Sequence, residues 1–190
     1  MNNLTLTETL KEHSATTHDA VDNLVMSVQP FANRDNYRKF LQAQHEFHST
    51  VNPIYHNAKL ASQIDGLAEL ARLDRVKSDM KDLEVAPFDK DIKTPTFTDS
   101  EAIGWLYCVE GSNVGAGILY KEAGKIDLTD TFGASHLSAH PDGRMPHWRA
   151  TKAKIDVLPL SDDERASAIK GADDAFAYFK RVIRQIYDVA

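Results

Sequence analysis

The sequence predicts an all-α protein, and three observations support this prediction. Apolar residues recur at helical spacing, every three or four positions, along most of the 190 residues. Three Thr/Ser-x-x-Glu capping boxes stand directly before such apolar runs. Segments in which apolar and polar residues alternate, as they do in strands, are essentially missing. Because 190 residues are enough to bury one core, we expect a single domain over residues 1–190.

The helices are expected in six segments. Each capping box marks a helix start, because its two side chains bond the free N–H groups of the first turn. Pro53 should bend or end the second helix, since proline lacks an N–H and clashes with the preceding turn. The boxes pair Thr5 with Glu8, Thr98 with Glu101, and Ser161 with Glu164. The expected ranges are about 5–26, 34–56, 67–83, 98–123 and 147–157, with a last helix that opens at Ser161.

The composition argues against several classes of protein. A net charge of −6 and a pI near 5.7 argue against nucleic-acid binding. No apolar run approaches the roughly 18–20 residues of a membrane span, and the first residues lack the apolar core of a signal peptide. We therefore expect a cytoplasmic protein. Cys108 is the only cysteine, which excludes an intrachain disulfide, a Cys-rich zinc site and a Cys-x-x-Cys-His haem attachment.

The segment 104–120 has helical hydrophobicity but an unusual number of glycines. Gly111, Gly115 and Gly117 each cost about 1 kcal/mol relative to alanine inside a helix. One interpretation is close packing between helices, and another is a kinked helix whose backbone lies over a flat ligand. A nucleotide loop is poorly supported, since no strand precedes the glycines and no phosphate-binding motif follows them.

A second informative pattern lies on the first helix. Positions seven apart differ by only about 20° around a helix, so Lys11 and His18 share a face, with Lys11 about 10.5 Å earlier along the axis. Asp22 lies one turn beyond His18, within reach of its imidazole. A haem needs partners in this order: a cation for its propionates, an imidazole for its iron, and an acceptor for the Nδ1–H of that imidazole. The alternative is that His18 is an ordinary surface or core histidine.

The other candidate residues have simpler interpretations. His45 and His48 are three residues apart, but no His-Glu-x-x-His and no repeated Glu-x-x-His accompanies them. Core or surface positions are therefore favoured over a shared metal. Cys108 stands beside bulky residues and is interpreted as a buried structural cysteine rather than a nucleophile. Glu110, the carboxylate next to Gly111, is interpreted as a solvated helix position.

Together these segments resemble the haem oxygenase family, in particular its short bacterial branch from pathogens that scavenge haem iron. The resemblance rests on His18 in the first helix and on the Glu-Gly-Ser-x-x-Gly signature of residues 110–115. It extends to residues 24–26, 30–37, 131–137 and 171–176. It implies a helical fold with haem b between a proximal first helix and a kinked, Gly-rich distal helix. His18 would be the axial ligand of the iron, with Gly111, Ser112 and Gly115 forming the catalytic distal face.

The resemblance implies that O₂ opens the haem ring, giving biliverdin, CO and free iron for iron acquisition. The segment 104–120 has no His, Arg or Lys. Because peroxidases use distal acid–base side chains to cleave the O–O bond, their absence from this segment favours attack on the ring. The chain has no flavin, nicotinamide or iron–sulfur motif, so electrons must come from an external reductase or ferredoxin. We expect the protein to be a monomer.

By the same resemblance, Lys11 and Tyr107 hold the haem propionates, a combination that goes with α cleavage. Relatives that cut at β and δ lack both residues and use a distal-helix lysine where this chain has Glu122. A carboxylate there would repel a propionate, so we expect biliverdin IXα as the main product. Asp22 is shorter than the glutamate found at this place in many relatives, and we expect it to reach His18 directly or through a water molecule.

Two other functions stay open at this point. A haem-binding or storage protein could use His18 without turnover, and a thiaminase-like enzyme of the same fold would need a nucleophilic cysteine. A non-catalytic helical bundle is the simplest remaining alternative. Mixing the protein with hemin and then adding ascorbate or a reductase in air separates these possibilities, because only an oxygenase produces a biliverdin spectrum.

Overall fold

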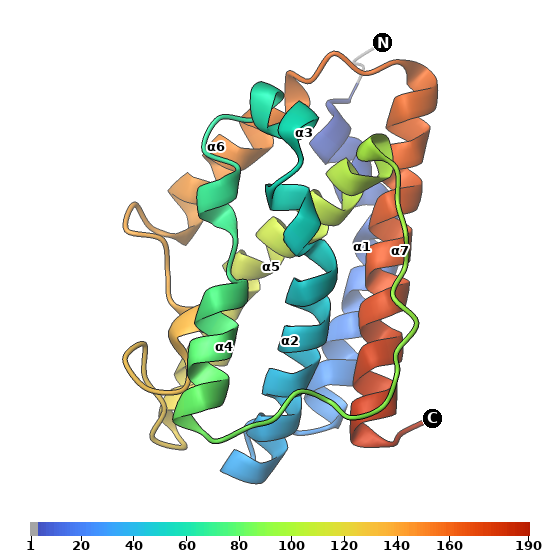
Figure 1. Cartoon of the computed structure of the whole chain (residues 1–190). Helices are drawn as coiled ribbons and strands as arrows, with labels where there is room; N and C mark the ends of the chain where they lie inside the picture. The colour runs from blue at the N-terminus through green and yellow to red at the C-terminus, as the bar shows by residue number, and fades with distance from the viewer. Residues whose placement is uncertain (1–3) are drawn as a thin grey trace.

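The computed structural model describes residues 4–190, which form a bundle of helices (Figure 1). This part of the chain contains no strand, only isolated bridges at Thr129, so the all-α prediction is confirmed. Within it, no helix is long and apolar enough to cross a membrane. The helices are α1 (Leu6–Ser27), α2 (Arg34–Tyr55), α3 (Ala58–Gln63), α4 (Leu73–Asp82), α5 (Asp99–Gly124), α6 (Arg144–Asp156) and α7 (Asp162–Tyr187), with 3₁₀ turns η1 (Ala68–Leu70) and η2 (Ser135–Leu137).

The three predicted capping boxes are all present. At the starts of α1, α5 and α7 the cap side chain accepts a hydrogen bond from the backbone N–H three residues on. The glutamate at that position accepts from the N–H of the cap residue, at 2.8 Å in each case. These reciprocal bonds satisfy donors that the first turn of a helix leaves free. The predicted starts of the first, fourth and last helices are therefore confirmed.

The helix predicted over residues 67–83 is wrong in its first part. The chain forms the short turn η1, becomes extended at Ala71 and starts α4 only at Leu73. Arg72 explains the break, because its buried guanidinium donates to the backbone carbonyls of His136 (2.6 Å) and Ser138 (3.0 Å). Apolar spacing continues through the break, which is why the pattern predicted one helix. The short helix α3, capped by Asn57, was not predicted.

The fifth predicted helix begins one turn earlier than expected, at Arg144 instead of His147. Pro146 occupies its first turn, where proline is tolerated because the backbone N–H groups have no partner inside the helix. Arg144 itself donates to the carbonyl oxygens of Asn113 (2.8 Å) and Leu137 (2.5 Å). The start of α6 is thus tied to the middle of α5.

Helices α5 and α7 pack closely because each presents a glycine to the other. A methyl group on Gly104 would overlap the Ala168 carbonyl, and one on Gly171 would overlap the backbone of Glu101. Glycine therefore has a packing role at these two positions, and it brings the two backbones into contact. This contact fixes the position of α5, on which the predicted distal residues lie.

The first helix and the distal helix are held by the same two neighbours. Helix α1 packs on α7 and α6, and α5 also packs on α7 and α6. In Figure 1, α1, α2 and α7 run side by side, while α5 crosses the bundle obliquely behind α2. The exposed residues of α1 and α5 that carry the predicted site are therefore placed by shared supports rather than by a direct α1–α5 interface.

Candidate functional site

His18 lies on α1 with its side chain 56% exposed. Its Nδ1 atom is 3.4 Å from Oδ2 of Asp22 and 3.9 Å from Oδ1 of Asp19. The distance from Nδ1 to Asp22 is longer than a normal hydrogen bond. It would allow a direct bond after a small movement, or a bridging water molecule. The edge of the Phe176 ring on α7 lies against the imidazole, with 6.0 Å between ring centroids. The ring is thus oriented on one side and accessible on the other.

The two predicted propionate anchors differ in their surroundings. Lys11 is exposed on α1, and no carboxylate lies within ion-pair distance of it among residues 4–190. Tyr107 is partly buried on α5, where its ring packs on Trp148 of α6 at 5.4 Å between centroids. Burial, with smaller effects of Cys108 and Asp156, raises the pKa of Tyr107 to about 12. The hydroxyl therefore stays protonated at neutral pH and can donate.

Asp156 binds the beginning of α1 and also affects the pKa of Tyr107. Its carboxylate accepts hydrogen bonds from the backbone N–H (2.8 Å) and the hydroxyl (2.9 Å) of Thr7. The same carboxylate is close enough to raise the pKa of Tyr107. Thr7 is one turn before Lys11, so Asp156 holds the end of α6 against the turn of α1 that precedes Lys11.

The distal residues Gly111, Ser112 and Gly115 are not equivalent. A Cβ atom on Gly115 would meet no other atom within 4 Å, so this glycine faces open space. A Cβ on Gly111 would lie 3.4 Å from the indole of Trp148, which makes Gly111 part of the α5–α6 contact. The Ser112 hydroxyl donates to the Val109 carbonyl at 2.6 Å. The open face of the distal helix is therefore centred on Gly115 and the exposed Ser112.

Glu110 is buried, so its interpretation as a solvated position is wrong. Its side chain is 3% exposed and accepts a 2.6 Å hydrogen bond from the hydroxyl of Tyr55 on α2. Asn113 donates to its other oxygen at 3.3 Å, and Nε2 of His147 lies 3.9 Å away. Burial raises the pKa of Tyr55 well above its usual value, and the Glu110 charge adds to this effect. No local pattern could reveal the Tyr55 contact, because 55 residues separate the partners.

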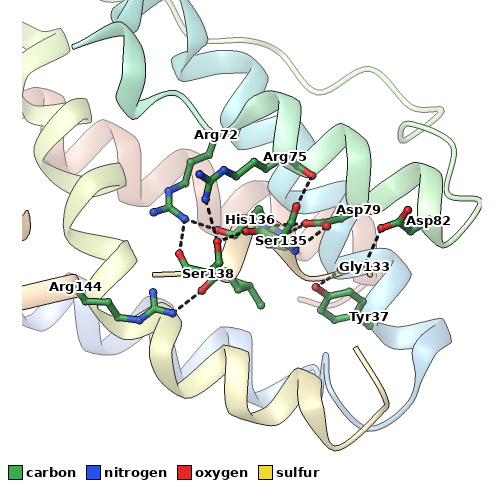
Figure 2. Close-up of polar contacts among 11 residues, drawn as sticks. Tyr37, Arg72, Arg75, Asp79, Asp82, Gly133, Ser135, His136, Ser138 and Arg144 are labelled. Carbon is green, nitrogen blue, oxygen red and sulfur yellow. Dashed lines mark hydrogen bonds and ion pairs between the residues drawn. The ribbon is translucent and has the colours of Figure 1, made fainter. Parts of the chain in front are cut away.

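A second buried polar cluster joins α4 to the segment around η2 that follows the distal helix (Figure 2). Asp79 of α4 accepts hydrogen bonds from the backbone N–H groups of Ser135 (2.8 Å) and His136 (2.9 Å) and contacts Nδ1 of His136 at 2.7 Å. Burial alone would raise the pKa of Asp79, but the bonds from His136 and Ser135 outweigh it and hold the pKa below its usual value. This cluster fixes the segment that also binds Arg144. In the sequence, the only sign of this cluster is that Arg72 and Asp79 are charged residues within an apolar repeat.

The environments of His48 and Cys108 are those of core residues. His48 is buried, and burial, with neighbouring His136, Arg72 and His45, lowers its pKa to about 3. No group of three or more His, Cys, Asp or Glu residues in the described part of the chain could hold a metal ion. The thiol of Cys108 points at the Ala172 carbonyl (3.7 Å), and burial raises its pKa. A neutral, enclosed thiol is a poor nucleophile.

The arrangement suits a flat, anionic macrocycle that binds through an axial imidazole. His18 presents an accessible ring, and Gly115 leaves its side of α5 free of side chains. Lys11 and Tyr107 offer a cation and a hydroxyl donor to carboxylates. Arg144 lies against Gly117, which is about 160° around the helix from Gly115, so its cationic group is directed away from the open face.

Three comparisons with known proteins bear on this site. A protein-family model described as heme oxygenase matches residues 4–185. The chain is 37% identical over 172 residues to heme oxygenase PigA of Pseudomonas aeruginosa, covering 90% of this chain and 87% of that protein. It is 47% identical to heme oxygenase from Neisseria meningitidis, solved with NO and CO bound, with a TM-score of 0.95 over 99% of this chain and 94% of the other.

A more distant structure shares the fold. Heme oxygenase-1 from the cyanobacterium Synechocystis, solved in complex with heme, superposes with a TM-score of 0.76 over 96% of this chain and 92% of the other at 17% identity. At this identity the likeness extends to the arrangement of helices and no further. The order and packing of the helices described above are therefore those of a known architecture.

Proposed function

Because this chain belongs to the haem oxygenase family, we propose that it cleaves haem with O₂ and externally supplied electrons, releasing biliverdin, CO and iron. The observation that carries the proposal is an accessible imidazole on α1 together with an open glycine face on α5, two helices that are held by the same neighbours, α6 and α7. His18 supplies the first and Gly115 the second. Haem is the substrate of this reaction and supplies the iron at which O₂ is reduced.

His18 is proposed to bind the haem iron through Nε2. Its other ring nitrogen faces Asp22, which can orient the imidazole and hold the proton on Nδ1. At 3.4 Å the contact leaves room for a small shift on haem binding or for a bridging water molecule. A neutral imidazole supported in this way is a moderate electron donor to iron.

The distal side is proposed to act through backbone and shape. Gly115 allows the helix to approach the haem closely, since a side chain there would occupy the space beside the macrocycle. Residues 104–120 of α5 carry no cationic side chain, and Arg144 lies on the other side of the helix. The Ser112 hydroxyl is engaged with a backbone carbonyl, which leaves its oxygen as an acceptor for solvent. This surface favours attack of bound oxygen on the ring.

Biliverdin IXα is the proposed main product. The in-plane orientation of haem depends on where its propionates bind, and Lys11 on α1 and Tyr107 on α5 are their proposed partners. Glu122, near the other end of α5, offers no cation. Its carboxylate pairs with Lys125 at 2.7 and 2.8 Å, so the repulsion it exerts on a propionate is weaker than that of a lone carboxylate. The attractive contacts therefore carry most of the preference.

Electrons are proposed to come from a separate reductase or ferredoxin, since the chain has no redox-cofactor motif of its own. Release of iron from haem would serve iron acquisition. We further propose that the monomer is the working unit, because α1 and α5, which carry the proposed site residues, are both held by α6 and α7 of the same chain.

Reconstitution with hemin tests this function. The haem-loaded protein should show a histidine-ligated Soret band, and ascorbate in air should replace it with a biliverdin spectrum. A stable Soret band under these conditions would identify a carrier instead. Absence of any hemin complex would favour an enzyme of the same fold that uses another substrate, although the buried thiol of Cys108 makes a cysteine-dependent reaction unfavourable.

A further inference from the structure

Helix α6 is strongly basic within an acidic protein. It carries Arg144, Arg149, Lys152 and Lys154 against a single carboxylate, Asp156, whereas the whole chain has a net charge of −6. Among residues 4–190, each Lys or Arg that lies within 4.0 Å of a carboxylate belongs to another element. The positive charge of α6 is therefore not neutralised by the protein itself.

Two of the four cations have structural partners. Arg144 donates to backbone carbonyls of α5 and of η2, and Lys154 donates to the Asp65 carbonyl at 2.7 Å. Arg149 is exposed and has no hydrogen bond within the described chain. Lys152 extends over the indole of Trp148, with its Nζ atom 5.8 Å from the ring centroid. Arg149 and Lys152 thus form the part of α6 that is free to meet a partner.

Trp148 connects this surface with the candidate site. Its indole lies beneath Lys152, within 3.4 Å of the Cβ position of Gly111, and 5.4 Å from the ring of Tyr107 between centroids. A single aromatic side chain thus separates the basic surface from the distal helix. A protein that docks on α6 would stand close to the site at which the proposed reaction needs electrons.

We propose that α6 is the docking surface for an acidic electron-donor protein of the iron–sulfur ferredoxin class. This inference rests on the proposed function, which requires electrons from outside the chain. In each encounter the reduced iron–sulfur centre gives up one electron and haem iron accepts it, passing from ferric to ferrous, and no atom is transferred. An acidic donor is repelled by most of this acidic molecule and attracted to α6, which orients it before contact.

The size of the surface suits a transient complex. A helix of 13 residues is roughly 20 Å long. Electron-transfer encounters typically bury less than about 1,200 Å², so one helix and its borders are enough. Affinity in such complexes depends on charge and falls as salt screens it, over roughly 10 Å at 0.1 M ionic strength.

Charge reversal tests the docking surface directly. Arg149→Glu combined with Lys152→Glu is compared with Lys90→Glu combined with Lys93→Glu, two exposed lysines on the segment between α4 and α5. Both double variants change the net charge equally. The Kd of each haem-loaded protein for an acidic plant-type [2Fe–2S] ferredoxin is measured by calorimetry at low and moderate salt. We expect the α6 variant to bind roughly tenfold more weakly or worse and to lose most of its salt dependence, while the control pair changes little.

Two further measurements separate other uses of the same cations. Hemin affinity and ascorbate-driven cleavage should be unchanged in the α6 variant. A loss of hemin affinity would assign the cations to the substrate, and loss of binding to anionic vesicles with unchanged ferredoxin binding would assign them to a membrane surface; either result overturns the proposal. Equal weakening in both variants, or in neither, also overturns it. Failure of the wild-type protein to cleave haem with ascorbate would instead refute the proposed function, whatever the ferredoxin Kd.

Discussion

The hydroxyl of Tyr55 donates a 2.6 Å hydrogen bond to the carboxylate of Glu110, and both side chains are almost completely buried. Glu110 is the residue directly before Gly111, so this bond joins the C-terminal end of α2, where Tyr55 is the last residue, to the distal helix. A buried carboxylate must be hydrogen-bonded, because the free energy of leaving it without a donor is large. The Tyr55–Glu110 pair is therefore a support of the distal helix rather than part of its open face.

Tyr55→Phe should destabilise the protein by about 1–3 kcal/mol, because it leaves the Glu110 carboxylate buried with a lost donor. Urea unfolding followed by circular dichroism measures this change. Tyr107→Phe is the matched control: its hydroxyl has no hydrogen bond within residues 4–190, so the same substitution should alter the free energy of unfolding much less. Equal losses of stability in the two variants would contradict the role assigned to the Tyr55 hydroxyl.

His18→Ala should remove the protein ligand to iron and abolish turnover while helicity is retained, since the side chain is exposed. External imidazole should restore part of the haem spectrum. His13→Ala is a suitable control because His13 lies on the same helix and pairs with Asp173 at 2.9 Å instead. An unchanged histidine-type haem spectrum in His18→Ala would reassign the ligand.

Gly115→Leu should impair haem affinity or oxygen chemistry far more than stability. The position faces open space, and leucine raises helix propensity by up to about 1 kcal/mol relative to glycine. Gly124→Leu provides the comparison, because Gly124 also meets nothing within 4 Å but lies at the end of α5. If Gly115→Leu is as active as the wild type and more stable, the glycine serves only the helix itself.

The stability of the protein should fall in acid partly through His48. Its pKa is lowered to about 3 in the folded protein, chiefly by burial, against an ordinary value of 6.5. Below pH 6.5 the unfolded chain therefore binds a proton that the folded protein does not. The free energy of unfolding should decrease by up to about 1.4 kcal/mol per pH unit from about pH 6 toward pH 3.

His48→Leu should flatten this part of the pH dependence, as measured by urea unfolding between pH 4 and 7. His56→Gln changes an exposed histidine and should leave the slope as it is in the wild type. The groups that act on His48 are His136, Arg72 and His45, so the test is read as a difference in slope rather than in absolute stability. An unchanged slope in His48→Leu would show that other groups cause the acid sensitivity.

The unmodified protein should yield mainly biliverdin IXα. Lys11→Asn combined with Tyr107→Phe should divert part of the product to other isomers, because the propionates lose a cation and a hydroxyl donor. Chromatography of the product isomers measures the distribution. A product of mainly β or δ isomers from the wild type would refute the assigned anchors.

The sequence alone was sufficient for the helix starts with capping boxes, for the shared face of Lys11 and His18, and for the family. These features are local or periodic: a capping box spans four residues, and a helix face follows from 3.6 residues per turn. The distance from Nδ1 of His18 to Asp22, one turn apart, bears this out. The sequence also showed that the Gly-rich segment is unfavourable for a helix, which indicated that its glycines have a specific role.

The role of each glycine became clear only from the tertiary structure. Gly104 and Gly171 allow α5 and α7 to touch, Gly111 meets Trp148, and Gly115 faces open space. Nothing within the segment distinguishes these positions, because the atoms that do so lie on α6 and α7. The same holds for Glu110, which is buried by a tyrosine 55 residues away.

The break before α4 has the same origin. Arg72 leaves the helical pattern because carbonyl oxygens of η2 and Ser138, more than 60 residues later, accept its hydrogen bonds. Hydrophobic periodicity records which side of a segment is apolar, but it does not record which polar partners the rest of the fold will supply. Local pattern therefore predicted most of the helices and the proposed iron-binding face, and long-range contacts determined where the pattern is broken and what supports the helices.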